Sequence, residues 1–528
     1  METNALRAVR ISLFLILTFA FILNSDAGSA TWDLNSTSGD WNTAANWTPD
    51  TVPNGSTQTA TFAESNTPEV ALSASTTVKN IVFSPGASAF TISTYLEALE
   101  IEGKGMINNS GVTQQFLVPI DPSGSHGLLE FFNTAKAGNN TAYSIEGSEA
   151  ATDGGQINFW NSSSANGASF VLQGGGSHAR TTGGRVFFND TSTAGNGTFD
   201  CQSGGSGNFG GSFAAVIFND TSSAGNATLT AEPAVDNSSF YGTVVFEGES
   251  SAANATLIAM GPQNREGGVL FFSESSTGDR ATVKILGTGT MWMHVITGPT
   301  LTIGSLEGEG TLFMESKNLV VGSNNSDTSF TGAIEGSGSL TKIGTGVFIL
   351  AENGKRVHTG PLIVEGGALL AGISAAPATG SGPVQVNHGA FGGKGQVAGA
   401  VTVGDGTGPG AFLSPGIHGA GVLTIQSSLT FKDSSQCNWD LEATLVEADQ
   451  TIAKGVTIGS GVLFAPHVRG DMPLPTGTVF TVLSNTDSTP IAGTFGNLPD
   501  GGTITVGSNT FQANYEGGDG NDLTLTIL

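Results

Sequence analysis

The sequence of 528 residues contains only two cysteines, Cys201 and Cys437. Small secreted domains are commonly held together by several disulfides, and two cysteines allow one disulfide at most. A disulfide framework is therefore excluded, and the stability of the chain must come from a feature that extends along its length.

Charged residues are also scarce, and positively charged residues most of all. They make up 12% of the chain, and 18 Lys and Arg against 44 Asp and Glu give a net charge of −26. Nucleic acids and anionic lipids are bound by cationic surfaces, so this balance argues against both as partners. The 77 glycines, together with the prevalence of Ser, Thr and Asn, instead favour β-structure with many turns.

Sequence motifs of common catalytic sites are missing. The chain has no Gly-x-Ser-x-Gly, His-Glu-x-x-His or Cys-x-x-Cys motif. The histidines stand apart from one another, at His126, His178, His294, His358, His388, His418 and His467. The arginines of the central region are Arg180, Arg185, Arg265 and Arg280. From this pattern we expect no catalytic residue, no cofactor and no metal site, and a protein that is not an enzyme.

The first 30 residues have the three regions of a secretory signal peptide. Arg7 and Arg10 precede the apolar run 11–23, and small residues occupy positions 25, 27, 28 and 30. The run is shorter than the roughly 20 residues that span a bilayer, which favours a cleaved signal over a retained membrane anchor. We expect cleavage after Ala27 or Ala30 and a secreted, extracellular or cell-surface protein without a transmembrane anchor.

A sequence motif with an aromatic residue recurs six times between residues 128 and 292. Each copy has an aromatic anchor and, ten residues later, a hydroxyl residue. A period of 26–30 residues with short apolar runs and no helical pattern predicts one coil of a β-solenoid per repeat. The anchors are Phe131, Phe159, Phe188, Phe218, Phe246 and Phe272, and the hydroxyl residues are Thr141, Ser169, Thr198, Thr228, Thr256 and Thr282.

These repeats predict an all-β fold, a right-handed parallel β-helix whose coils stack about 4.8 Å apart. The anchors would form an aromatic ladder, and alternating segments such as 227–231 would supply the next face. Asn189-Asp190 and Asn219-Asp220 fall between these strands and could be interpreted as metal or acid/base residues. We predict instead that these residues form turns, because Asn and Asp tolerate positive φ and their side chains bond to nearby backbone N–H groups.

Residues 319–371 form the most specific stretch of the chain. A strict period of two runs through Gly336, Gly338, Leu340, Lys342, Gly344, Gly346, Phe348 and Leu350. With 330–332 before it and 366–370 after it, the stretch resembles the autotransporter-associated β-strand repeat of bacterial passenger proteins. The resemblance implies an extended parallel β-helix and does not imply an enzymatic activity. A three-residue insertion in 353–360 departs from the family and puts His358 in the place of an aromatic residue.

The predicted organisation has five parts. These parts are a signal peptide (1–30), an N-terminal β region with a Trp-rich cap (31–127), six solenoid repeats (128–292), the β-strand repeat region (293–373) and a C-terminal passenger-like β region (374–528). We expect a C-terminal β-hairpin or small β region to close the solenoid. We expect no translocator barrel of the protein's own, because such a barrel needs a long series of further strands.

Trp32, Trp41 and Trp47 lie close together at the start of the expected mature chain. They could be stacking platforms for sugar rings, or they could cover the open end of the first coil. The terminal coil of any solenoid exposes a hydrophobic end and an unpaired edge, so we predict that the three tryptophans cap the first coil.

Residues 517–522, near the end of the sequence, match the Gly-Gly-x-Gly-x-Asp motif of calcium-binding β-rolls. Such rolls need tandem copies that share ions between successive turns, and this chain has one copy. We therefore predict the tight turn of the last hairpin, formed by Asp519, Asn521 and Asp522, with a calcium loop as the alternative.

Together these features predict a secreted or cell-surface, non-catalytic β-solenoid with a structural or adhesive role. Its partners would be glycans, extracellular matrix or other surface components, bound through a long polar face. The alternative is a polysaccharide-degrading β-helix enzyme, either a lyase or a glycoside hydrolase. Such an enzyme needs carboxylates brought together from adjacent coils, so a groove that gathers three or more of them would favour it.

Overall fold

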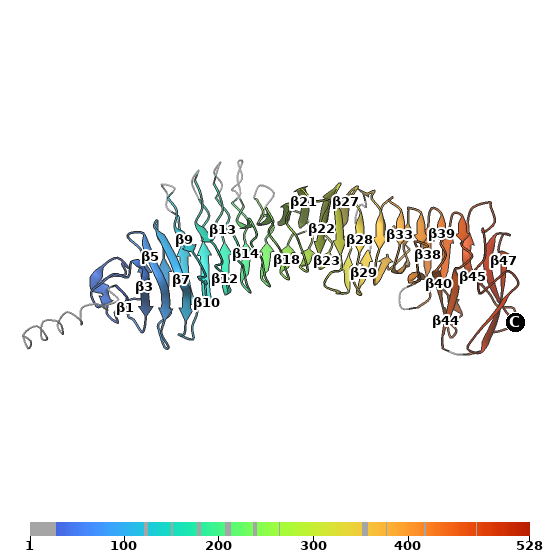
Figure 1. Ribbon diagram of the computed structural model, residues 1–528, viewed down its shortest axis with the longest axis horizontal. Coiled ribbons are helices and arrows are strands. Elements are labelled where there is room, and N and C mark those ends of the chain that lie inside the picture. Colours follow the sequence, from blue (N-terminus) through green and yellow to red (C-terminus); the bar gives the residue numbers. More distant parts are fainter. Residues whose placement is uncertain are drawn as a thin grey trace, which may run out of the picture.

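The computed structural model describes residues 28–528 except 121–124, 149–151, 177–180, 206–212, 236–239, 263, 351–356, 376, 417–418 and 471. The described chain is an all-β parallel β-solenoid of about 16 turns, drawn out into a long rod (Figure 1). Its only described helical element is a 3₁₀ turn, Ala44–Asn46, so the described part holds no helix that could cross a membrane.

Two parallel sheets, A and B, start at the N-terminal end of the rod; sheet A runs as far as β30, and sheet B continues to β44. The strands of sheet A are β1 (Ala30–Trp32), β3 (Gly55–Phe62), β5 (Thr76–Phe83), β7 (Ala98–Asn108), β9 (Leu128–Phe131), β11 (Gln156–Phe159), β13 (Arg185–Phe188), β15 (Ala215–Phe218), β17 (Thr243–Phe246), β19 (Val269–Glu274), β21 (Thr290–Ile296), β24 (Thr311–Glu315), β27 (Ala333–Gly336) and β30 (Val357–His358), with β2 (Trp47–Thr48) antiparallel to β1. The strands of sheet B are β4 (Glu69–Ala71), β6 (Thr91–Ser93), β8 (Gln114–Val118), β10 (Asn139–Ile145), β12 (Gly167–Leu172), β14 (Thr198–Cys201), β16 (Thr228–Ala231), β18 (Thr256–Ala259), β20 (Thr282–Ile285), β23 (Ser305–Gly308), β26 (Thr328–Phe330), β29 (Val347–Leu350), β32 (Ala368–Ala371), β34 (Gly389–Gly393), β37 (Ala411–Pro415), β40 (Ser435–Glu442) and β44 (Leu463–Arg469), with β41 (Glu447–Ala448) antiparallel to β40.

Two further sheets, C and D, complete the second half. Sheet C is parallel and consists of β22 (Thr300–Ile303), β25 (Asn318–Val321), β28 (Leu340–Lys342), β31 (Leu362–Val364), β33 (Val384–Val386), β36 (Val401–Val403), β39 (Leu429–Phe431) and β43 (Val456–Ile458). Sheet D is mixed and consists of β35 (Gln396–Val397), β38 (Val422–Ile425), β42 (Gln450–Ala453), β45 (Val479–Asn485), β46 (Thr503–Val506), β47 (Asn509–Gly517) and β48 (Asp522–Ile527). The antiparallel β45, β48, β47 and β46 end the rod, which confirms the expected closing β region.

The aromatic anchors form the predicted ladder inside the rod. Every successive pair from Phe131 to Phe272 is in register between neighbouring strands of sheet A. Their ring centroids lie 4.7 to 4.8 Å apart and the rings are within 6 to 8° of parallel. A second stack, Tyr143, Phe170 and Phe199, lies in sheet B with centroids 4.7 and 4.5 Å apart.

The row of hydroxyl residues is in register from Ser169 to Thr282, with one exception at its start. Ala142, not Thr141, pairs with Ser169, because the pairing of β10 with β12 is irregular between Asn139 and Ala142. Thr141 is buried instead, and its hydroxyl donates to the carbonyl of Ala137 at 2.7 Å.

The two cysteines are both free and buried, and they lie in different coils, on β14 and β40. The one disulfide that the sequence leaves possible does not form. The predicted signal peptide lies almost wholly outside the described residues. Ala30 already belongs to β1, where it is buried and pairs with Ala60, so cleavage after Ala27 is the expected position that leaves this strand intact.

Candidate functional site

The three N-terminal tryptophans form the cap and not a sugar platform. Trp32, Trp41 and Trp47 are 1%, 0% and 0% exposed and surround Phe62. Their indole N–H groups donate to backbone carbonyls at 3.1, 3.2 and 2.7 Å. Because all three side chains are fully buried, no sugar ring can stack on them.

The Asx residues after the anchors occupy left-handed turns, as predicted. Asn133, Asn161, Asp190 and Asp220 have φ values of 56°, 55°, 55° and 51°. The backbone N–H of each of the first three donates to the side chain of the next coil, at 2.9, 2.8 and 2.9 Å. The carboxylates of Asp190 and Asp220 therefore connect neighbouring coils.

The last acidic loop is the turn of a hairpin, as predicted. Gly517 and Asp522 pair across β47 and β48, and the N–H of Gly520 donates to the carbonyl of Gly517 at 2.9 Å. Asp522 is 9% exposed, and its Oδ1 accepts from the N–H of Asn485 at 2.8 Å. Burial raises the pKa of Asp522, against the effect of that hydrogen bond. Within the described residues no three His, Cys, Asp or Glu side chains gather as a metal site requires.

The histidines and arginines singled out from the sequence stay dispersed. His294, His388 and His467 each face one carboxylate, at 3.2, 3.6 and 3.4 Å. His358 is buried, and its Nε2 lies 2.7 Å from the carbonyl oxygen of Gly338. His178, His418 and Arg180 lie outside the described residues. Of the remaining arginines, Arg265 lies at a cavity and is considered below.

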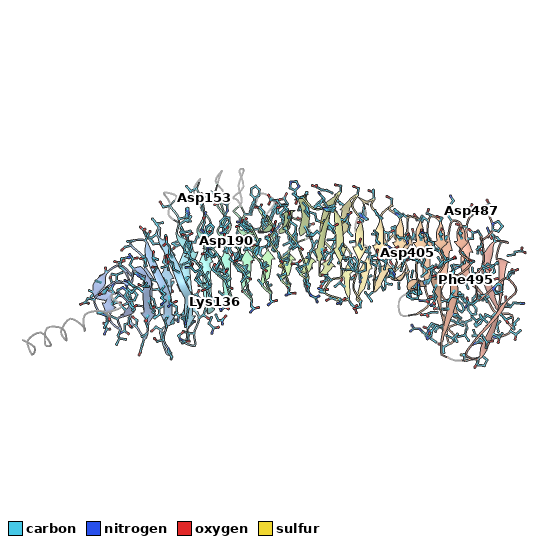
Figure 2. All side chains as sticks on the ribbon, in the orientation of Figure 1. Lys136, Asp153, Asp190, Asp405, Asp487 and Phe495 are labelled. Carbon is cyan, nitrogen blue, oxygen red and sulfur yellow. The ribbon has the colours of Figure 1, made fainter. Side chains whose placement is uncertain are left out.

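A polar face follows one edge of the repeats. Single bridges align one residue per coil: Lys136, Ser164, Thr193, Ser223, Ser251 and Thr277. Next to them, asparagine side chains bond from coil to coil, with Asn226 donating to Asn196 at 3.1 Å and Asn254 donating to Asn226 at 3.3 Å. Lys136 lies at the lower edge of the rod in Figure 2, opposite Asp153. This is the Ser, Thr and Asn surface that the sequence predicts.

The outer face of sheet A carries an apolar row that the sequence analysis missed. We call it the aromatic stripe. It consists of Phe187, Ile217, Val245, Phe271, Trp292 and Phe313, which are in register on six successive strands and are all half-buried. The same row is polar on either side, at Asn158 and Glu335. A signal existed in the sequence, because strands such as 186–188 and 270–272 are continuously apolar. A strand with one solvent-exposed face would instead alternate apolar and polar residues.

A cavity of about 670 Å³ opens beside the end of the aromatic stripe, and we call it the stripe cavity. Its lining consists of Tyr241, Asn264, Arg265, Glu266, Gly267, Val269, Thr288, Thr290, Trp292 and Phe313. The rings of Trp292 and Phe313 lie 4.0 Å apart. Gly267 is required there, because a Cβ atom on it would lie 2.3 Å from the backbone nitrogen of Gly289 in the next coil.

A second cavity, of about 740 Å³, shares Arg265 and has three carboxylates in its lining, those of Asp200, Glu232 and Glu309. Asp200 and Glu232 lie on neighbouring coils, whereas Glu309 lies three coils beyond Glu232. Asp200 pairs with Thr230, and Glu232 lies two residues further on the same outer face, so the two Cα atoms are about 8 Å apart. We call this the acidic cavity. It could not be predicted from the sequence, because Asp200 and Glu232 are far apart in the chain and become neighbours only through the coil register.

The carboxylates of the acidic cavity differ in their surroundings. Asp200 Oδ2 accepts from Gln202 at 3.3 Å, while its buried Oδ1 has no hydrogen-bond partner among the described residues. Burial, and then the charge of Asp200, raise the pKa of Glu232. Glu309 accepts from the N–H of Gly287 at 3.0 Å. Burial and the neighbouring charge of Asp200 therefore shift Glu232 toward its protonated form.

Compared with known protein families and with curated protein sequences, the chain matches none of them. The class of the protein is defined by the fold: it is a parallel β-solenoid protein.

Proposed function

We propose that the protein is a secreted or cell-surface β-solenoid with a structural or adhesive role, which binds glycan, matrix or other surface components along its outer face. The observation that carries this proposal is the polar face, where the same hydroxyl and amide groups recur on successive coils. Repeated groups at the strand spacing of about 4.8 Å suit a partner that is itself extended, because many weak contacts add along its length.

The net charge of the chain limits the chemical class of its partner. A net charge of −26 repels polyanions at low ionic strength, and neutral glycans are not affected by it. The sequence features of export support an extracellular setting for such a partner.

We further infer a relationship with passenger proteins that carry autotransporter-associated β-strand repeats. The strands β28 and β29 flank a bend in which Gly344 has a φ of +72°. Lys342 is 1% exposed at that bend, and its Nζ donates to three backbone carbonyls. The glycines and the lysine of the quoted pattern thus have structural tasks within a coil, which supports a scaffold role for the stretch.

The proposal is tested by applying the full mature chain to arrays of immobilised glycans and matrix proteins. We expect saturable binding to at least one glycan or matrix component. No binding to any of them, at protein concentrations up to the millimolar range, would contradict the adhesive role.

A polysaccharide-degrading activity is the second candidate, and the acidic cavity favours it. Glycoside hydrolysis requires two neighbouring carboxyl groups, one of which acts as the general acid, and a raised pKa favours that role. Glu232, whose pKa is raised, would be the acid, and Asp200 the base or nucleophile. Turnover of a polysaccharide that disappears in Glu232→Gln at unchanged melting temperature would support this candidate. Equal turnover in wild type and Glu232→Gln would exclude this site.

A further inference from the structure

The aromatic stripe is unusual because apolar side chains occupy an outward-facing row. Strand residues alternate between the interior and the outer face, and the interior of sheet A is filled by residues such as Val186, Phe188 and Leu270. The stripe residues between them make no contribution to that interior. Contiguous apolar surface on a soluble protein usually marks a binding site.

The stripe is too small for a second copy of the chain. A stable dimer buries about 800 Å² on each partner. The six stripe residues are already half-buried, so the apolar area left for a partner is far below that value. By contrast, the stripe cavity of about 670 Å³ lies within the range of small-ligand sites, roughly 300–1,000 Å³.

The lining of the stripe cavity is amphipathic. Tyr241, Trp292 and Phe313 give it apolar surface, while Thr288, Thr290 and Asn264 give it hydroxyl and amide groups. The Thr290 Oγ1 is buried and has no hydrogen-bond partner among the described residues. A ligand for this cavity therefore needs an apolar surface together with hydroxyl groups that exchange hydrogen bonds.

The charges at the stripe cavity balance each other. Arg265 and Glu266 both line it, and the Arg265 guanidinium already donates to the carbonyl of Val235. One Arg and one Glu therefore leave this lining without the net positive charge that would favour a carboxylate or sulfate group. The cavity therefore matches a neutral ligand better than an anionic one.

We propose that the stripe cavity and the aromatic stripe bind a neutral, extended polysaccharide that lies along the rod. A pyranose ring presents apolar C–H groups on its faces and hydroxyl groups around its edge, which is the chemistry of this lining. The apolar row continues from the cavity over several coils, so it accommodates a chain of sugar units and not one unit alone. This inference rests on the proposed function, and it names the ligand class and a site distinct from the polar face.

The test measures binding of soluble neutral polysaccharides, namely a β-glucan, a galactomannan and a xylan, to the mature full chain, with polygalacturonate as the anionic comparison. Isothermal titration gives the affinities. We expect a neutral polysaccharide to bind, and Trp292→Ala to weaken that binding about tenfold. Thr290→Val, which keeps the volume of the side chain and removes its hydroxyl, should weaken it several-fold.

Trp160→Ala is the matched control, because Trp160 is also half-buried and lies on another coil, where its indole donates to Glu130 at 3.0 Å. It should bind like wild type. Binding that is unchanged in both Trp292→Ala and Thr290→Val would overturn this site and leave the adhesive function standing. Preference for polygalacturonate would overturn the neutral ligand. Absence of binding to every polysaccharide would contradict this inference, and the glycan and matrix arrays then decide the proposed function separately.

Discussion

At the residue scale, two adjacent phenylalanines have opposite environments. Phe188 is fully buried between Phe159 and Phe218, with ring centroids 4.7 and 4.8 Å away, whereas Phe187 faces outward in the stripe. We expect Phe188→Ala to lower the free energy of unfolding by about 3–5 kcal/mol, because it leaves a cavity in the ladder. Phe187→Ala should cost less than half as much. Urea denaturation measures both changes, and equal losses would contradict the assignment of the two faces.

Lys342 is a buried cation at the end of β28. Its Nζ donates to the carbonyls of Ile343, Gly344 and Gly366 at 2.6, 3.5 and 3.4 Å. Burial lowers the pKa of Lys342 to about 8, and the charge of Asp327 acts in the opposite direction. The residue is thus held by hydrogen bonds while its charge is disfavoured by desolvation.

The pH dependence of the free energy of unfolding reports the lowered pKa of Lys342. The pKa is lower in the folded chain than the usual 10.5, so between about pH 8 and pH 10.5 the folded state binds fewer protons than the unfolded state. Stability contributed by Lys342 therefore rises with pH across that window. We expect the melting temperature of wild type to gain a few degrees over that of Lys342→Met between pH 7.5 and pH 10.5. A difference that stays constant over this range would contradict the lowered pKa.

At the scale of the element, the left-handed turns connect one coil to the next. Asp220 holds a φ of 51° and accepts a hydrogen bond from the N–H of Asp190. Asp220→Ala removes the acceptor and puts a less tolerant residue at positive φ, so it should cost about 2–3 kcal/mol of unfolding free energy. Asp220→Asn keeps both features and should unfold like wild type in the same urea titration. A large loss in the Asn variant would indicate that the negative charge itself is required.

The closing hairpin has a similar structural carboxylate. Asp522→Ala leaves the N–H of Asn485 without its acceptor, and we expect a loss of about 1–3 kcal/mol. The turn geometry predicts that this loss is the same with and without calcium. If calcium raised the melting temperature of wild type and left that of Asp522→Ala unchanged, the loop would be a calcium site.

The sequence predicted those elements whose residues repeat with a regular period. The aromatic anchors and their coil lengths could be read directly, because Phe131 to Phe272 recur at the positions that stack. The place of Thr141 could not be predicted, since the irregular pairing in β10 depends on how two neighbouring coils fit. The acidic cavity was missed for a related reason, whereas the aromatic stripe has a signal in continuously apolar strands such as 186–188. Residues such as Asp200 and Glu232 are ordinary in the sequence and meet only after the coils are in register.

At the scale of the whole molecule, the protein is a rod in which each coil contacts mainly its neighbours (Figure 1). Such a solenoid gains stability coil by coil, and its two ends need caps, here the tryptophan cluster and the mixed sheet D. Its outer face offers a polar face, an aromatic stripe and an acidic cavity along one chain. A rod of this kind is suited to hold an extended partner at several points along its length.

The most direct test of the account is one incubation of the mature full chain with each neutral polysaccharide, in which bound protein and new chain ends are measured together. The account predicts saturable binding and no new reducing or unsaturated ends. Release of such ends would contradict a non-catalytic binding protein and would identify the acidic cavity as the place to look. Absence of both binding and cleavage would contradict the role of the outer face in holding polysaccharide.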